Sequence, residues 1–236
     1  MSRLAIIPAR SGSKGLKDKN IKLLNGKPLL SYTVEAARKS DIFDEIIVST
    51  DSIEYANIAK KWGANVPFFR REELSSDTAS SWDVVKEVIK EYKELGKEFS
   101  TVALLQPTSP LRDSNDIVKG FQMMKRKNVK AVVSVCEVEH SPLWCNTLPE
   151  DYSMANFLDE SILNSNRQGL PTYYRINGAL YIVKTDYLFS VENIYKHSCS
   201  AIIMSKEHSI DIDDDYDFLI AEALLSKKEI NNKNNN

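Results

Sequence analysis

Cysteine is scarce in this chain of 236 residues, and the few thiols form no recognisable pattern. Cys136, Cys145 and Cys199 are odd in number, and their spacing matches neither a zinc site nor a redox pair. Reduced thiols are therefore favoured over a disulfide or a metal role. Long apolar runs are missing as well, since no stretch approaches the roughly 18 apolar residues of a membrane helix.

An excess of charge of one sign is also lacking. The 31 basic and 33 acidic side chains leave a formal net charge of −2. This balance provides no general attraction to nucleic acid or to an anionic membrane, so any anion binding must come from local clusters. The opening stretch "MSRLAIIPAR" has no signal-peptide architecture. We therefore expect a cytoplasmic protein that binds neither nucleic acid nor membrane.

The length and an ordinary hydrophobic content of 42% suit a single domain with a full core. We place this domain at residues 1–228. The final "NNKNNN" contains no apolar residue, and we expect residues 229–236 to be disordered.

Short β-branched runs alternate with helical patterns along most of the chain. Continuous apolar runs are typical of strands covered on both faces, and the expected strands are 4–9, 45–50, 101–106, 131–138 and 179–184. Helical patterns cover 29–40, 52–63 and 80–95. This alternation predicts an α/β fold with a mostly parallel, Rossmann-like sheet and helices on both faces. Ligands of such sheets bind beyond the carboxyl ends of the strands.

Residues 140–175 break this rhythm. The segment contains Pro142, Pro149, Pro171 and the aromatic Trp144, and it has no clear periodicity. A long irregular insertion in a compact domain is usually functional or serves assembly.

A cationic loop follows the first expected strand. The stretch "IIPARSGSKGLKDKN", Ile6–Asn20, carries Arg10, Lys14, Lys17 and Lys19. It matches neither the Walker A pattern nor G-x-G-x-x-G. Its glycines still allow backbone N–H groups to point into one concavity, where cations suit a polyphosphate. A solvated basic turn is the alternative, and this pattern alone leaves both open.

An acidic cluster stands near the other end, in "SIDIDDDYD". On a strand Asp211 and Asp213 share one face, with Cα atoms roughly 7 Å apart, and such a pair can hold Mg²⁺ against phosphate oxygens. The alternative is helix capping, which better fits Asp214 and Asp215 directly before the next helical pattern.

Six blocks together resemble one family. They are "IIPARSGSKGLKDKNIKLLNGKPLL", "IIVSTD", "RREELSSDTASS", "LLQPTSPLR", "YYRINGALYI" and "SIDIDDDYD". In this order, over about residues 4–225, the chain resembles the CMP-N-acetylneuraminate synthetases, the cytidylyltransferases that activate sialic acids. The resemblance implies a nucleotide-diphospho-sugar transferase fold and a homodimer in which residues 140–175 form a dimerisation and acceptor arm.

The reaction that the resemblance implies joins CTP and a nine-carbon 2-keto sugar acid, N-acetylneuraminate or a close relative, into a CMP-sugar and pyrophosphate. Legionaminate and pseudaminate are alternative acceptors. Two other classes are alternatives: an Asp-x-Asp glycosyltransferase, whose acidic pair normally follows an early strand, and a non-catalytic nucleotide-binding regulator, which would not need the pair.

The resemblance also implies residue roles. The nucleotide would be held by Arg10, Lys14, Lys19, Asn20, Arg70 and Ser81, although Arg71 beside Arg70 leaves that register open by one. The sugar acid would be held by Gln106, Thr108, Ser109, Arg167, Arg175 and Tyr181. For Ser109, turn chemistry between Pro107 and Pro110 is the alternative. Magnesium, or manganese in its place, would bind Asp211 and Asp213, and the catalytic residues would be Arg10, Lys19 and Asp211.

Overall fold

The computed structural model describes residues 2–12, 15–75, 80–163, 166 and 169–234, with the backbone alone at 229 and 231–234. Its centre is a six-stranded sheet in the order β4-β1-β5-β7-β6-β8. The strands are β1 (Arg3–Pro8), β4 (Glu45–Ser49), β5 (Thr101–Leu104), β6 (Ala131–Glu137), β7 (Tyr174–Lys184) and β8 (Cys199–Ile203). Only β7 runs antiparallel to its neighbours within this sheet. The expected mostly parallel α/β sheet is therefore confirmed.

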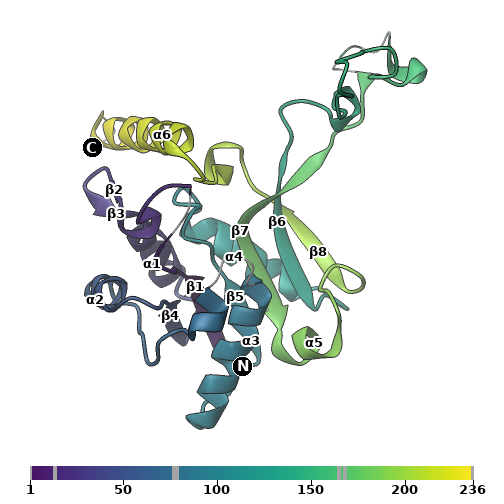
Figure 1. Ribbon diagram of the computed structural model, residues 1–236. Coiled ribbons are helices and arrows are strands. Elements are labelled where there is room, and N and C mark those ends of the chain that lie inside the picture. Colours follow the sequence, from purple (N-terminus) through teal and green to yellow (C-terminus); the bar gives the residue numbers. More distant parts are fainter. Residues whose placement is uncertain (1, 13–14, 76–79, 164–165, 167–168, 235–236) are drawn as a thin grey trace.

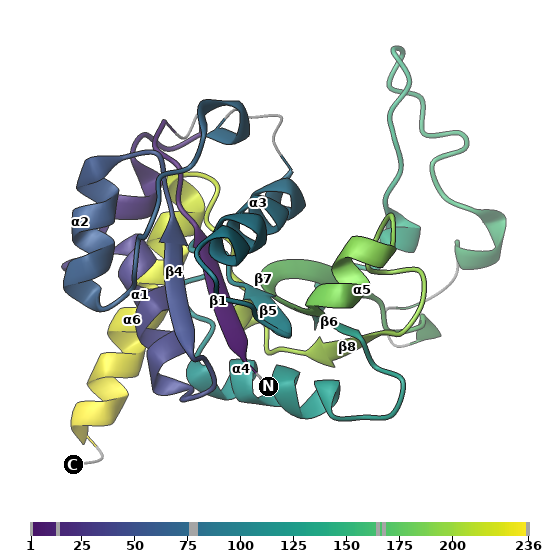
Figure 2. The same ribbon diagram turned by 90° about the horizontal axis from the view of Figure 1, so that it is seen from below.

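Helices cover both faces of the sheet, as expected. One face packs against α1 (Leu29–Lys39), α2 (Ile53–Trp62) and α4 (Ser114–Met124). The other packs against α3 (Ser81–Glu94) and α5 (Thr185–Ser190), so that α3 and α4 lie on opposite sides of the strands (Figure 2). In β1 the buried Leu4 and Ile6 face one layer, while Ala5 and Ile7 face the other. This two-sided burial explains the continuous apolar run.

Local signals set the helix ends. The Ser52 side chain accepts the backbone N–H of Tyr55 at the start of α2, and Gly63, with φ of +95°, ends that helix. At the start of α3 the Ser80 side chain accepts the N–H of Trp82.

A third, smaller core joins the two ends of the chain. Leu16 of the opening loop and Leu24 of the hairpin β2 (Leu23–Leu24) and β3 (Lys27–Pro28) pack against Ile212 and against Phe218 of α6 (Asp215–Asn234). Helix α6 lies beside this hairpin (Figure 1). The packing places the acidic segment next to the cationic loop.

The irregular segment stands away from the sheet as an extended arm (Figures 1 and 2). It contains the short 3-10 helices Pro142–Trp144 and Glu160–Ile162. It ends slightly earlier than expected, because β7 begins at Tyr174 and pairs there with Glu137.

The chain end differs from expectation. Helix α6 continues to Asn234, whereas composition predicted disorder from residue 229. Extending an existing helix by one residue avoids the cost of nucleation, which composition does not reveal. Among the described helices, none combines the length and the apolar content that crossing a membrane requires.

Candidate active site

The carboxyl ends of β1, β4 and β5 meet at one edge of the sheet, because these strands are parallel. The segments that follow β1 and β5 carry half of the predicted site residues. Strand β7 runs the other way, so its amino-terminal half, with Arg175 and Gly178, joins the same edge.

The cationic loop and the acidic segment are in direct contact. The Lys19 ammonium donates to the Ile212 carbonyl oxygen at 2.6 Å and pairs with Asp213 Oδ1 at 3.2 Å. A Cβ at Gly15 would lie 2.8 Å from the Asp213 carbonyl oxygen, so only glycine permits this approach. Two stretches about 190 residues apart in sequence thus form one site.

Arg10 and Asn20 support this loop from within. The buried Asn20 side chain donates through Nδ2 to the Arg10 carbonyl oxygen at 3.1 Å. The Arg10 guanidinium donates to the carbonyl oxygen of Ser75 at 3.2 Å, which brings the segment before α3 to the loop. Lys14 lies outside the described residues.

The structure distinguishes Arg70 from Arg71. Arg70 is buried and donates to the Ser49 hydroxyl and carbonyl oxygens at 3.1 and 2.7 Å. Burial and, to a smaller extent, Arg10 lower the pKa of Arg70 to about 10, against the raising effects of Asp51 and Glu87. Arg71 points outward and pairs with Glu87 and Glu91 of α3. Arg70 is therefore the arginine that faces the site.

Asp51 is a site residue that the sequence reasoning missed. Its carboxylate accepts the Ser11 backbone N–H at 2.7 Å and the Ser11 hydroxyl at 2.9 Å. It follows β4, the strand beside β1, and so holds the start of the cationic loop. Its place after an expected strand was the available signal, but strand pairing could not be read from the sequence.

Asp211 has the environment of a ligand for a cation. One of its oxygens, Oδ1, is buried and has no hydrogen-bond partner among the described residues. Burial raises the pKa of Asp211, Thr108 lowers it, and the neighbouring Asp213 raises it again. Gly178, with φ of +75°, leaves room beside Oδ2, since a Cβ there would lie 3.3 Å from this oxygen.

The predicted acceptor residues surround the same carboxylate. The Thr108 carbonyl oxygen accepts the Ile212 N–H at 2.8 Å, and the Gln106 amide oxygen faces Gly178. Arg175 donates to the Ser209 carbonyl oxygen at 3.1 Å.

The aromatic side of the site comes from β7 and α3. Burial raises the pKa of Tyr181 to about 12, and its ring meets Trp82 edge to face at 5.7 Å between centroids. This contact places Ser81, the first residue of α3, beside the acceptor residues.

Two predicted acceptor residues are not supported by a contact. Ser109 is fully buried, and its hydroxyl oxygen has no hydrogen-bond partner among the described residues. Its backbone N–H donates to the Gln106 carbonyl oxygen at 3.4 Å, as a turn requires, and a contact of its hydroxyl with the sugar acid stays a prediction. Arg167 lies outside the described residues.

Arg112 was not predicted, yet it braces the acceptor loop. It is fully buried, and its Nη1 donates to the carbonyl oxygens of Gln106 at 3.3 Å and Ala179 at 3.1 Å. Burial lowers the pKa of Arg112 to about 10, while Asp116 and Asp113 raise it. The sequence gives no indication that this arginine, in a short loop motif, is buried and connects β5 to β7.

A nucleotide-binding type of sheet, with a cationic loop facing two carboxylates at its carboxyl edge, is the arrangement of a nucleotidyltransferase. The chain belongs to the cytidylyltransferase family, which it matches over residues 4–222. This finding and the sequence relatives confirm the resemblance to CMP-sialic acid synthetases.

Three relatives carry different acceptor names. The chain is 40% identical over 226 residues to N-acylneuraminate cytidylyltransferase of Escherichia coli O18:K1:H7, covering 95% of this chain and 52% of the relative. It is 35% identical to CMP-N,N'-diacetyllegionaminic acid synthase of Legionella pneumophila, covering 95% and 97%. It is 33% identical to pseudaminic acid cytidylyltransferase of Campylobacter jejuni, covering 95% and 96%. The chain thus spans about half the length of the first relative.

Among solved structures, the chain resembles CMP:2-keto-3-deoxy-manno-octonic acid synthetase complexed with CTP. The TM-score is 0.73 at 17% identity, and the match covers 97% of this chain and 100% of that chain. At this identity the likeness supports the fold alone, a mostly parallel α/β sheet with helices on both faces.

Proposed function

We propose that the protein transfers the cytidylyl group of CTP to a nine-carbon 2-keto sugar acid, N-acetylneuraminate or a close relative. The observation that carries the proposal is the contact of Lys19 with Asp213, which joins the cationic loop to the acidic pair at the carboxyl edge of the sheet. Family membership and the names of the three relatives support the same reaction.

In this reaction the anomeric hydroxyl oxygen bonds to the α-phosphorus of CTP. The bond from that phosphorus to the bridging oxygen breaks, and pyrophosphate leaves with the electron pair while the hydroxyl loses its proton. Arg10 and Lys19 would neutralise the growing negative charge, since pre-placed cations stabilise charge that develops in a transition state. Arg70, buried beside β4, would bind near the base and ribose.

Asp211 and Asp213 would hold magnesium, or manganese in its place. Asp211 fits this role because its buried Oδ1 has no hydrogen-bond partner in the described structure. Burial also raises the pKa of Asp211, so its ionised form would be stabilised by a nearby cation. A divalent cation supplies charge neutralisation and lowers the pKa of a bound hydroxyl. Lys19 pairs with Asp213 at 3.2 Å and would orient this carboxylate for the ion.

We also propose that the arm makes a homodimer. The support is apolar exposure on the arm, where Leu148, Tyr152, Met154 and Leu163 are all more than half exposed. A cytoplasmic location is part of the proposal, because CTP is made and used inside the cell. The glycosyltransferase and regulator alternatives have no support from the family match.

The test is pyrophosphate release from CTP with magnesium and a panel of N-acetylneuraminate, legionaminate, pseudaminate and the eight-carbon acid KDO. We expect turnover with at least one nine-carbon acid and none with KDO. No release with any nine-carbon acid would refute the proposed reaction.

The metal assignment is tested by Asp211→Asn, with Asp214→Asn as the matched control. Asp214 Oδ1 accepts the backbone N–H groups of Tyr216 and Asp217, and asparagine keeps such a cap. We expect Asp211→Asn to lose about 100-fold or more in kcat/KM, about 3 kcal/mol of transition-state stabilisation, and Asp214→Asn to stay near wild type. A folded Asp211→Asn enzyme of near-normal rate would refute the metal role.

A further inference from the structure

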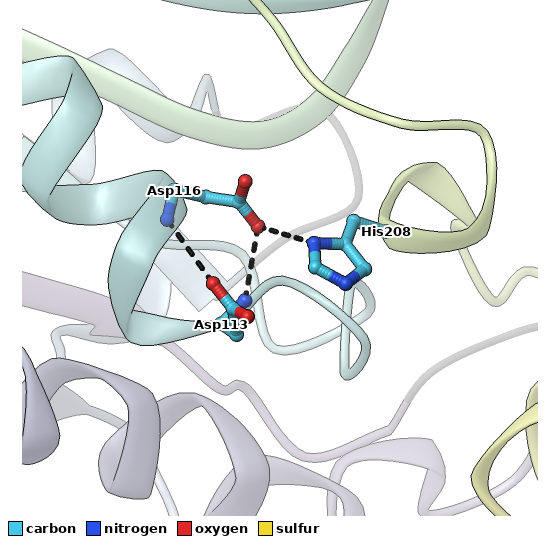
Figure 3. A group of neighbouring side chains, drawn as sticks. All are labelled: Asp113, Asp116 and His208. Carbon is cyan, nitrogen blue, oxygen red and sulfur yellow. Dashed lines mark hydrogen bonds and ion pairs between the residues drawn. The ribbon is translucent and has the colours of Figure 1, made fainter. Parts of the chain in front are cut away.

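Three side chains cluster beside the proposed site without belonging to it: Asp113, Asp116 and His208 (Figure 3). His208 Nδ1 lies 2.7 Å from Asp116 Oδ2. Asp113 Oδ1 accepts the Asp116 backbone N–H, and Asp116 Oδ2 accepts the Asp113 N–H in return, which closes a capping box on α4. These bonds account for the geometry, so we assign no metal to the cluster.

The contact connects two segments that carry site residues. Asp116 lies in the first turn of α4, directly after the loop that holds Gln106 and Thr108. His208 lies in the 3-10 helix Glu207–Ser209, three residues before Asp211. The pair therefore ties the acceptor loop to the acidic segment, from side chains that are 4% exposed for Asp116 and 26% exposed for His208.

The acidic segment depends on a few such attachments. The Asn177 amide donates to the Ser209 hydroxyl at 2.8 Å, and the Ile212 N–H donates to the Thr108 carbonyl oxygen at 2.8 Å. Between these points the Asp211 side chain leaves one buried oxygen without a partner in the described residues. Its position thus relies on how firmly the backbone on either side is held.

We propose that His208 and Asp116 are positioning residues, whose contact holds residues 207–213 so that Asp211 and Asp213 are placed to bind a divalent cation. The inference rests on the proposed function of that pair. His208 and Asp116 touch neither the ion nor the substrates; they act through the backbone that carries the ligands.

The charges around the pair give the inference a pH signature. The hydrogen bond to Asp116 raises the pKa of His208, against burial, which lowers it; Asp113 also raises it, and Lys228 lowers it. For Asp116, burial raises the pKa, but the His208 hydrogen bond and the Asp113 N–H outweigh it, and the pKa is lowered. Lys119 also faces Asp116, and the buried Arg112 interacts with it.

Protonated His208 should hold the acidic segment more firmly than neutral His208. Because the folded pKa of His208 is raised above the ordinary value of about 6.5, the stabilisation by its contact with Asp116 is complete below that value. The effect is lost as the pH rises through the folded pKa. Neutral histidine still donates a hydrogen bond, but a charge-assisted bond is about twice as strong. The segment should therefore be held most firmly on the acidic side of neutrality.

The experiment compares His208→Phe, His208→Gln and Asp116→Asn in the full chain, with His197→Gln as the matched control. His197 has an exposed side chain, and its carbonyl oxygen, which accepts the Tyr187 hydroxyl, is retained in the variant. Mn²⁺ is titrated into a mixture of protein and CTP and, as a reference, into CTP alone. The concentration of free Mn²⁺ is measured by electron paramagnetic resonance. Magnesium activation of pyrophosphate release is measured in parallel.

We expect His208→Phe to weaken Mn²⁺ binding about tenfold, as losses of residues that orient metal ligands do. His208→Gln should recover part of this loss, because its amide can donate to Asp116. Asp116→Asn should also weaken binding, and His197→Gln should not. The ratio of wild type to His208→Phe should be larger near about pH 6 than near about pH 8.5.

The outcomes test the metal pair and the positioning role of His208 and Asp116 separately. Wild-type protein that binds no Mn²⁺ beyond CTP itself would overturn the metal pair of the proposed function together with this inference. Wild-type binding that is unchanged in folded His208→Phe and Asp116→Asn proteins would overturn the positioning role alone. A loss of Mn²⁺ affinity in His208→Phe that is the same at every pH would also overturn the positioning role.

Discussion

Replacing Gly178 with alanine separates backbone strain from interference with the proposed metal site. Gly178 has φ of +75°, at the point where the pairing of β6 with β7 shifts register. A Cβ there would lie 3.3 Å from Asp211 Oδ2 and 3.6 Å from Gln106 Oε1. Gly26, in the turn between β2 and β3, also has φ of +75°, but a Cβ there would meet no atom within 4 Å.

The matched backbone angles allow the two effects to be estimated. An alanine held in the left-handed region costs about 1–2 kcal/mol, so both variants should lose about that much free energy of unfolding. The additional contact at Gly178 forces Asp211 to move by a few tenths of an ångström, which uses up much of the roughly 0.5 Å within which the groups of such a site must be held. We expect the magnesium concentration for half-maximal activity to rise about tenfold in Gly178→Ala.

The assays are urea unfolding for stability and pyrophosphate release at varied magnesium for the site. Gly26→Ala should match Gly178→Ala in the first assay and wild type in the second. Equal magnesium dependence in all three proteins would refute the close approach of Gly178 to a metal ligand. Unchanged stability in both variants would refute the strain argument.

Two further predictions concern the nucleotide and the arm. Arg70→Met should weaken CTP binding at least about tenfold and cost about 1–3 kcal/mol of stability by removing the two buried hydrogen bonds from Arg70 to Ser49. Arg71→Met, which loses ion pairs made by a largely exposed guanidinium, should stay within about 1 kcal/mol of wild-type stability and bind CTP normally by calorimetry. An equal loss of CTP affinity in both variants would mean that Arg71 also binds the nucleotide. Light scattering should show a dimer that Met154→Asp converts to a monomer and that Ile53→Asp, on α2, leaves intact. A monomeric wild type at micromolar concentration would remove the role of the arm.

The sequence predicted the central strands well because burial on both faces leaves a continuous apolar run, as in β1 and β5. It missed β8 because Ile202 is the one buried residue of this edge strand, and its polar and exposed residues hide the pattern. It began β7 at residue 179 instead of Tyr174, since the first three residues of that strand, Tyr174, Arg175 and Ile176, are exposed. No local pattern encodes the reversed direction of β7.

The site could be predicted only as separate pieces. The cationic loop and the acidic pair were each visible, but neither reveals that Lys19 reaches Asp213, because that contact depends on the third core around Ile212 and Phe218. Family resemblance supplied the connection that local physics could not. The pair of His208 and Asp116 had no signal at all, since one lone histidine and one helix-capping aspartate are ordinary in isolation.

The reversed direction of β7 also determines how the arm relates to the site. Parallel strands bring only their carboxyl ends to the site edge, whereas β7 brings its amino-terminal half, which follows directly after the arm. Arg175 therefore lies one residue from the strand start while it donates to Ser209 beside the acidic segment. The nucleotide side of the site, around Arg10 and Arg70, lies next to β1 and β4, which form one end of the sheet and are separated from β7 by β5. For this reason, a substitution in the arm should change the KM for the sugar acid more than it changes the KM for CTP.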